Sequence, residues 1–231
     1  ENYKLTLDVK AKILTGKLPS AYEIMEEVIL RTNFRDKKRL KELLLEMKAK
    51  TQASFVSAGH SLAAGRALSY FNVGNKISEE LKGLSQYRFI EDLVENFDDK
   101  ADELIEMLEK VCANVFVKEN LMVDYTGTKA GLDEVIEISN KLCKVLPVSV
   151  DKDKVLLSPK CEILNEAFKT SGQVQFVCRA GNFVSKGLPY TGTLKVLRVL
   201  LGYDYLWNNV RVKGGAYGCM CTFGNSGNAA F

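Results

Sequence analysis

Two polar side chains on either side of a pair of glycines are the residues of this sequence best suited to chemistry. The stretch DYLWNNVRVKGGAYGCMCTF, residues 204–223, places Arg211 and Tyr217 around Gly214 and Gly215. Arginine brings a permanent charge and a fork of N–H donors, and tyrosine brings a phenolic donor. Glycines let the backbone bend sharply or come close to a ligand. Together these groups could hold a polarised carbonyl oxygen, as an oxyanion hole does.

The same spacing also has a purely structural interpretation. The stretch reads as the end of a helix, a tight diglycine connection and a strand over 216–223 with alternating side chains. In that interpretation Arg211 is a surface residue and Tyr217 is half-buried beside a β-turn. The spacing alone leaves both interpretations open.

Other catalytic motifs are missing from the sequence. His60 is the only histidine, so neither H-E-x-x-H nor the inverted H-x-x-E-H can occur. The G-G-x-x-G of residues 214–218 follows a helix and precedes a strand, which is the reverse of a dinucleotide-binding turn. There is no P-loop and no G-x-S-x-G. The residues of this sequence therefore lack a complete catalytic set, and His60 is better explained as a packed or solvent-edge side chain than as a metal ligand.

Composition narrows the class of protein. The 231 residues are 46% apolar and 26% charged, which is typical of a soluble globular protein with one large or two ordinary domains. The net charge of +3 comes from interspersed acids and bases, so we expect no nucleic-acid surface, although residues 37–39 read Lys-Lys-Arg. No apolar run reaches 18 residues, so we expect no membrane span.

The cysteines and the two ends of the sequence carry further expectations. Six cysteines without a C-x-x-C pair favour buried free thiols in a reducing compartment. The sequence begins and stops inside what read as structural elements, so we expect a piece of a longer polypeptide.

Hydrophobic periodicity predicts an α+β fold with mainly antiparallel sheets and helices packed on one face. Alternating patterns predict strands at 3–13, 121–126, 161–168, 173–183 and 216–223. Helical spacing predicts helices from a capping box at Ser20, from a cap at Asp36, over 78–97, from a cap at Asp98 to Phe116, over 132–145, and from Tyr190 towards Trp207. A polar linker is predicted at 147–159, and the small residues 58–65 predict close packing of another helix.

Several segments resemble the C-terminal half of pitrilysin-type zinc metallopeptidases of the presequence-protease branch. The resemblance is most specific in R-V-K-G-G-A-Y-G, within TGTLKVLRVLLGYDYLWNNVRVKGGAYGCMCTF, and it extends to NEAFKTSGQVQFVCRAGNF, NFRDKKRLKELLLEMKA, SAGHSLAAGRALSYF and FVKENLMVDYTG. It implies a protein of four related α/β units that enclose a chamber for peptides. Residues 1–128 would be the later part of the third unit, and residues 129–231 the early part of the fourth.

The resemblance also implies roles for residues. Arg211 and Tyr217 would bind the scissile carbonyl and stabilise the oxyanion, and Gly214, Gly215 and Ala216 would contact the substrate. The zinc motif would lie in a first unit that is absent here, so the whole enzyme would use zinc and this chain would bind none and be inactive alone.

These expectations combine into a hypothesis with stated alternatives. We expect a part of a zinc peptidase that degrades short unstructured peptides, with the N-terminal half of the same polypeptide as its partner. The alternative is a non-catalytic scaffold or partner subunit of the same fold, and a nucleic-acid binder is a third, less supported interpretation. The expected location is a bacterial-type cytoplasm, with a mitochondrial or other organelle matrix as the alternative.

Overall fold

The computed structural model describes residues 5–14, 16–149 and 159–231 and contains two compact units. Unit 1 combines Leu44–Glu95 with Leu157–Phe231, and unit 2 combines Asn2–Leu43 with Asn96–Leu156. Each unit therefore joins segments that are far apart in the sequence. This division by contacts does not test the predicted family units 1–128 and 129–231, which stay a prediction.

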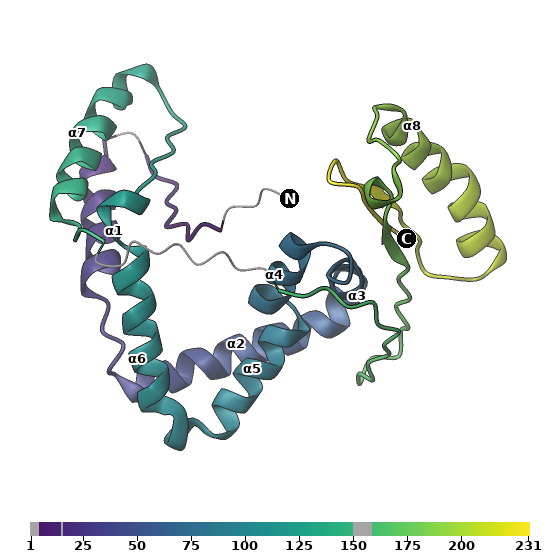
Figure 1. The fold of residues 1–231 in the computed structure, drawn as a ribbon, viewed down its shortest axis with the longest axis horizontal. Coiled ribbons are helices and arrows are strands. Elements are labelled where there is room, and N and C mark those ends of the chain that lie inside the picture. Colours follow the sequence, from purple (N-terminus) through teal and green to yellow (C-terminus); the bar gives the residue numbers. More distant parts are fainter. Residues whose placement is uncertain (1–4, 15, 150–158) are drawn as a thin grey trace. The chain divides into compact units, whose positions relative to one another are not determined.

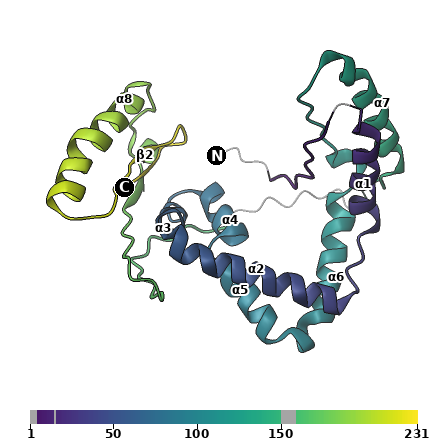
Figure 2. The same cartoon turned by 180° about the vertical axis from the view of Figure 1, so that it is seen from behind.

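Unit 2 is helical in its described residues. It contains α1 (Leu18–Arg31), the beginning of α2 (Lys37–Ser57), α6 (Phe97–Val115), the 3-10 helix η1 (Lys118–Asn120) and α7 (Lys129–Val145). Figures 1 and 2 show α1 beside α7, and the Tyr22 hydroxyl lies 2.8 Å from the Ser139 hydroxyl between them. Val135 and Leu142 supply the buried apolar positions of α7.

The helices of unit 2 form where sequence periodicity and end chemistry agree. In α6, Phe97, Ala101 and Leu104 recur at three- and four-residue spacing and are buried. The acids of its first turn, Asp98 and Asp99, lie at the positive end of the helix dipole.

Unit 1 combines helices with the only sheet among the described residues. Its helices are the remainder of α2, α3 (Gly59–Leu68), α4 (Val73–Lys82), α5 (Leu84–Glu95), the 3-10 helix η2 (Val184–Lys186), α8 (Thr193–Leu200) and the π-helix η3 (Leu201–Lys213). Its strands are β1 (Ala180–Asn182), β2 (Thr222–Phe223) and β3 (Asn228–Ala230). Figure 1 shows α8 and η3 as one continuous helix beside these strands.

The sheet is antiparallel, with β3 between β1 and β2. Ala180 pairs with Ala230, and Thr222 pairs with the same alanine from the other side. The rings of Phe183, Phe223 and Phe231 meet edge to face, with neighbouring centroids 6.4 and 5.9 Å apart. This aromatic cluster attaches the strand that follows the candidate site to the rest of the sheet.

The α+β class is compatible with this architecture, but the predicted extent of sheet is wrong. The predicted strands at 121–126 and 161–168 have no ladder partner in the described structure, nor do residues 5–13 or most of 173–183 and 216–223. Alternation in sequence favours an extended backbone, but a strand also needs a neighbour to accept its hydrogen bonds. Only residues 180–182 and 222–223 of these segments find one.

The helix predictions are confirmed in type and corrected at several ends. The Asp36 carboxylate accepts a hydrogen bond from the Arg39 N–H at 3.0 Å, so the predicted cap of α2 is confirmed. The capping box at Ser20 is wrong, because α1 begins at Leu18 and no side chain caps it. The predicted cap at Asp98 is also wrong, since α6 begins one residue earlier and Asp98 pairs with Lys41 at 3.3 Å.

Two further helix expectations changed with the tertiary structure. The predicted helix over 78–97 is divided into α4 and α5 at Gly83. The small residues of α3 receive a side chain rather than a helix, since a Cβ added at Gly59 would overlap the Phe176 ring. The predicted linker at 147–159 lies mostly outside the described residues. None of the described helices is both long enough and apolar enough to cross a membrane.

Candidate carbonyl-binding site

The predicted site lies at the end of η3 and in the residues that follow it. Arg211 occupies the last turn of the helix, and Tyr217 follows two residues after the diglycine. Both side chains are exposed, and Tyr217 is 92% exposed. A tyrosine this exposed makes no contribution to a core, so the half-buried Tyr217 of the structural alternative is wrong.

The diglycine ends the helix. Gly215 adopts the left-handed conformation with a φ of 73°, and its N–H donates to the Arg211 carbonyl at 3.0 Å. The Ala216 N–H donates to the Val210 carbonyl at 3.1 Å. At Gly214 an added Cβ would lie 2.6 Å from the Val210 carbonyl oxygen, so a larger residue would displace the helix end. Both glycines thus have a structural reason to be glycine.

This cap limits how the three small residues could contact a substrate. The Gly214 N–H also donates to the Arg211 carbonyl. The N–H groups of Gly214, Gly215 and Ala216 are therefore engaged by the helix itself. Their predicted contact with a substrate stays a prediction, and it would involve their carbonyl groups or Cα atoms rather than these donors.

Trp207 determines the surroundings of the Arg211 side chain. The guanidinium carbon lies 4.3 Å from the centre of the Trp207 ring, which is a cation–π contact between residues four positions apart on one helix. Among the described residues no carboxylate pairs with Arg211. The sequence analysis missed Trp207, although a tryptophan four residues before an arginine on a predicted helix is a recognisable signal.

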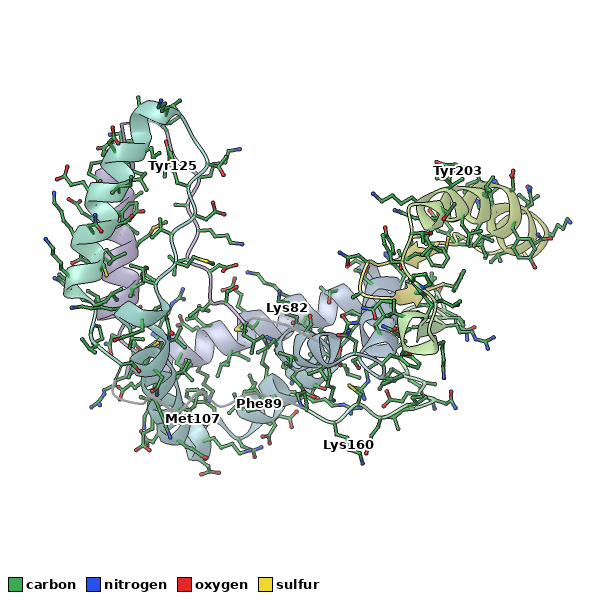
Figure 3. All side chains as sticks on the ribbon, turned by 45° about the horizontal axis from the view of Figure 1, so that its top comes forward. Lys82, Phe89, Met107, Tyr125, Lys160 and Tyr203 are labelled. Carbon is green, nitrogen blue, oxygen red and sulfur yellow. The ribbon has the colours of Figure 1, made fainter. Side chains whose placement is uncertain are left out.

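The helix itself is unusual in conformation and in exposure. π-helices are mostly seen as single turns and often occur at functional sites, whereas η3 extends over 13 residues. Neither α8 nor η3 contains a buried residue, and Figure 3 shows their side chains, Tyr203 among them, standing out from the helix. Behind it, the buried Cys221 thiol lies 3.6 Å from the Arg198 carbonyl and links α8 to the segment leading into β2.

The described residues do not form a metal centre. No group of three or more His, Cys, Asp or Glu side chains within 5–14, 16–149 and 159–231 could hold a metal ion. All six cysteines are free, and burial raises the pKa of the Cys112, Cys178 and Cys221 thiols. The donor set that the structure describes therefore does not fit zinc.

A second polar cluster in unit 1 is saturated by its own residues. Arg66 of α3 donates to Glu166 at 2.7 and 2.9 Å and to the buried Glu79 at 3.3 Å, and the Tyr70 hydroxyl also donates to Glu166. The hydrogen bond from Arg66 is the main cause that lowers the pKa of Glu166, while burial, with help from Glu166, raises the pKa of Tyr70 to about 12. Its donors and acceptors are used, so this cluster is a structural clamp.

Two cavities of about 210 and 310 Å³ lie within unit 2. The smaller is lined by residues of 29–35 with Glu109 and Cys112, and the larger by three lysines of α2 with Phe97, Asp98 and Ala101. Neither lining includes a residue of 204–223. The candidate site is thus an exposed helix end rather than a pocket of this chain.

Two family models match the sequence. Residues 1–93 match a peptidase-associated domain model, and residues 165–231 match the model described as "PreP C-terminal domain". The second match contains α8, η3 and both Arg211 and Tyr217.

Curated relatives match almost the whole chain. Protein HypA of Clostridium perfringens is 31% identical over 96% of this chain and 23% of its own length. Presequence protease 1, chloroplastic/mitochondrial, of Arabidopsis thaliana is 27% identical over 93% of this chain and 20% of its own length. The mitochondrial presequence protease of Saccharomyces cerevisiae is 25% identical over 89% of this chain and 22% of its own length.

The chain therefore spans roughly a fifth to a quarter of the length of these relatives. Family models at both ends and relatives along nearly the whole chain agree with each other. The chain belongs to the pitrilysin-type peptidases of the presequence-protease branch and corresponds to part of their C-terminal region.

Proposed function

We propose that this chain provides the substrate-side wall of the peptide chamber in a peptidase that degrades short unstructured peptides. Arg211 and Tyr217 would donate hydrogen bonds to the oxygen of the carbonyl under attack. The names of the presequence proteases among the relatives support peptide hydrolysis by the whole protein. A role as a non-catalytic scaffold, by contrast, would give neither exposed donor a purpose.

One observation carries the proposal. Tyr217 is 92% exposed, and Arg211 has no carboxylate partner among the described residues. The other arginine of unit 1 with comparable donors, Arg66, is instead saturated by Glu79 and Glu166. Two unsatisfied donors near one capped helix end suit a ligand oxygen that arrives from outside the chain.

The chemistry of these donors favours the transition state. As a carbonyl is attacked, negative charge develops on its oxygen, so a positive guanidinium and a phenolic O–H bind that oxygen more strongly than they bind the ground state. Neither group needs to gain or lose a proton for this role. Their contribution is therefore expected mainly in turnover rather than in substrate binding.

The remaining parts of the active site would come from the rest of the polypeptide. We place residues 1–128 and 129–231 in the third and fourth metallopeptidase-like units, with the N-terminal half of the same protein as partner. Zinc would be held by residues outside this chain, because the described donor set does not fit it. The organellar names of two relatives support an organelle matrix as the location, and a bacterial-type cytoplasm stays a prediction.

The first testable prediction concerns the two donors in the whole protein. Tyr217→Phe removes one hydroxyl and Arg211→Ala removes the charge, and each should lower kcat for a model peptide about 100-fold or more, with a smaller change in KM. Steady-state kinetics on the purified variants measures both constants.

Matched controls separate this role from general damage. Tyr205→Phe removes the hydroxyl of another exposed tyrosine of η3, and Lys213→Ala removes a cation two residues beyond Arg211. Both should leave kcat within about threefold, less than 1 kcal/mol of barrier. If Tyr217→Phe and Arg211→Ala also stayed within that limit, the proposed function would fail.

A further inference from the structure

The Arg211 guanidinium is held at one face by the only tryptophan of the sequence. Its central carbon lies 4.3 Å from the centre of the Trp207 ring. Trp207 is 43% exposed, so this contact contributes to the surface of η3 rather than to a core. An indole is the best aromatic partner for a cation, because its face carries the strongest negative potential.

Stacking leaves the hydrogen-bonding capacity of an arginine unused. The N–H donors of a guanidinium lie in its plane and point outward from its edge, whereas the contact with a ring uses its face. A carboxylate partner would instead occupy the edge, as Glu166 does at Arg66 with bonds of 2.7 and 2.9 Å. Trp207 can therefore hold Arg211 while its donors stay available to a carbonyl oxygen.

The main chain of Arg211 is held as well. Its carbonyl accepts hydrogen bonds from the Gly214 and Gly215 N–H groups, the latter at 3.0 Å. Both ends of the residue are thus restrained, the carbonyl by the diglycine cap and the guanidinium by the indole. Restraint of a long side chain before binding reduces the entropy lost when it grips a ligand.

We propose that Trp207 is a positioning residue that pre-organises Arg211 for the carbonyl oxygen of a bound peptide. This inference rests on the proposed function of Arg211 and adds a residue to it. The competing explanation is that the stack only stabilises the end of η3. The two explanations differ in whether the effect of Trp207 on catalysis requires Arg211.

A double-mutant cycle in the whole protein tests the proposal. Trp207→Leu removes the ring face, and Trp207→Phe restores an aromatic face at the same position. Trp207→Leu should lower kcat/KM for a model peptide about 5- to 30-fold, mostly in kcat, and Trp207→Phe should recover activity to within about threefold of wild type. In the Arg211→Ala background, Trp207→Leu should change kcat/KM less than about twofold.

A matched control comes from the same helix. Tyr203→Leu, which removes a 76% exposed aromatic from η3, should leave kcat/KM within about twofold. An equal loss from Trp207→Leu with and without Arg211, or a loss that Trp207→Phe does not recover, overturns the proposal. If Arg211→Ala impairs turnover and Trp207→Leu does not, only the positioning role fails; if Arg211→Ala has no effect, the proposed function fails with it.

Discussion

Gly214 and Gly215 illustrate how single residues prepare the candidate site. Gly215 is needed for its left-handed φ of 73°, and Gly214 is needed because a side chain would meet the Val210 carbonyl oxygen. Their common effect is to end η3 directly after Arg211 and to redirect the chain towards Tyr217. The glycines act through backbone conformation, which places the two donors without touching a ligand themselves.

A residue-scale prediction follows from the difference between two glycines. Gly214→Ala should destabilise the protein by about 1–3 kcal/mol and reduce peptide turnover about tenfold or more, because the helix end and Arg211 must shift. Gly218→Ala is the control, since nothing lies within 4 Å of a Cβ there and its φ is not positive. Thermal denaturation and steady-state kinetics compare the two variants, and equal effects would contradict the cap as the cause.

At the scale of elements, side chains hold a segment that has no ladder. Residues 159–179 form no strand, yet Glu166 joins this segment to α3 through Arg66, Phe168 lies under the Arg88 guanidinium, and Phe176 fills the space above Gly59. Arg66 also reaches Glu79, whose carboxylate accepts from the Ser85 N–H at 3.2 Å where α5 begins. The clamp therefore fixes α3, α4, α5 and the segment together.

The clamp predicts a pH-dependent stability. The pKa of Glu166 is lowered by Arg66 in the folded protein, so its contribution is present above the unfolded value of about 4.3 and is lost as the pH falls through the folded pKa. Glu166→Gln should cost about 1–3 kcal/mol at pH 7, and the gap from wild type should close as the pH falls below about 4. Urea denaturation followed by circular dichroism across this range measures the gap.

A second acid in the same segment is the control. Glu162 pairs only with the exposed Lys160 at 3.4 Å, so Glu162→Gln should stay within about 0.5 kcal/mol of wild type. Tyr70 adds the opposite limit, because its pKa is raised to about 12 and its contribution is lost as the pH rises through that value. A Glu166→Gln gap that did not depend on pH would contradict an ionic clamp.

At the scale of the whole molecule, this chain holds one side of a proposed active site. The candidate donors, their stacking partner and the cap all lie within residues 204–217, whereas no metal-binding group exists among the described residues. The long helix of α8 and η3 is apolar around most of its circumference and has no buried residue. Such helices are normally covered, which supports the proposal that the rest of the polypeptide packs here.

The corresponding prediction concerns metal content. The 231-residue chain, purified alone, should contain far less than one equivalent of zinc after dialysis and should cleave no model peptide. Elemental analysis measures the zinc, and Cys219→Ser with Cys221→Ser shows whether any residual metal is held by these thiols. One tightly bound equivalent in the chain would contradict the assignment of zinc to another part of the protein.

The sequence by itself determined what depends on local order: the amphipathic helices, the donor pair around the diglycine and the resemblance to presequence proteases that the family models confirm. Only the tertiary structure decided what depends on distant partners. Alternating segments such as 161–168 could become strands only beside a neighbour, and Arg66 found its acid one hundred residues away. Periodicity is a property of consecutive residues, whereas ladders and ion pairs depend on which segments the fold brings together. Even the stack of Trp207 on Arg211, four residues apart, required a helix that continued to Lys213.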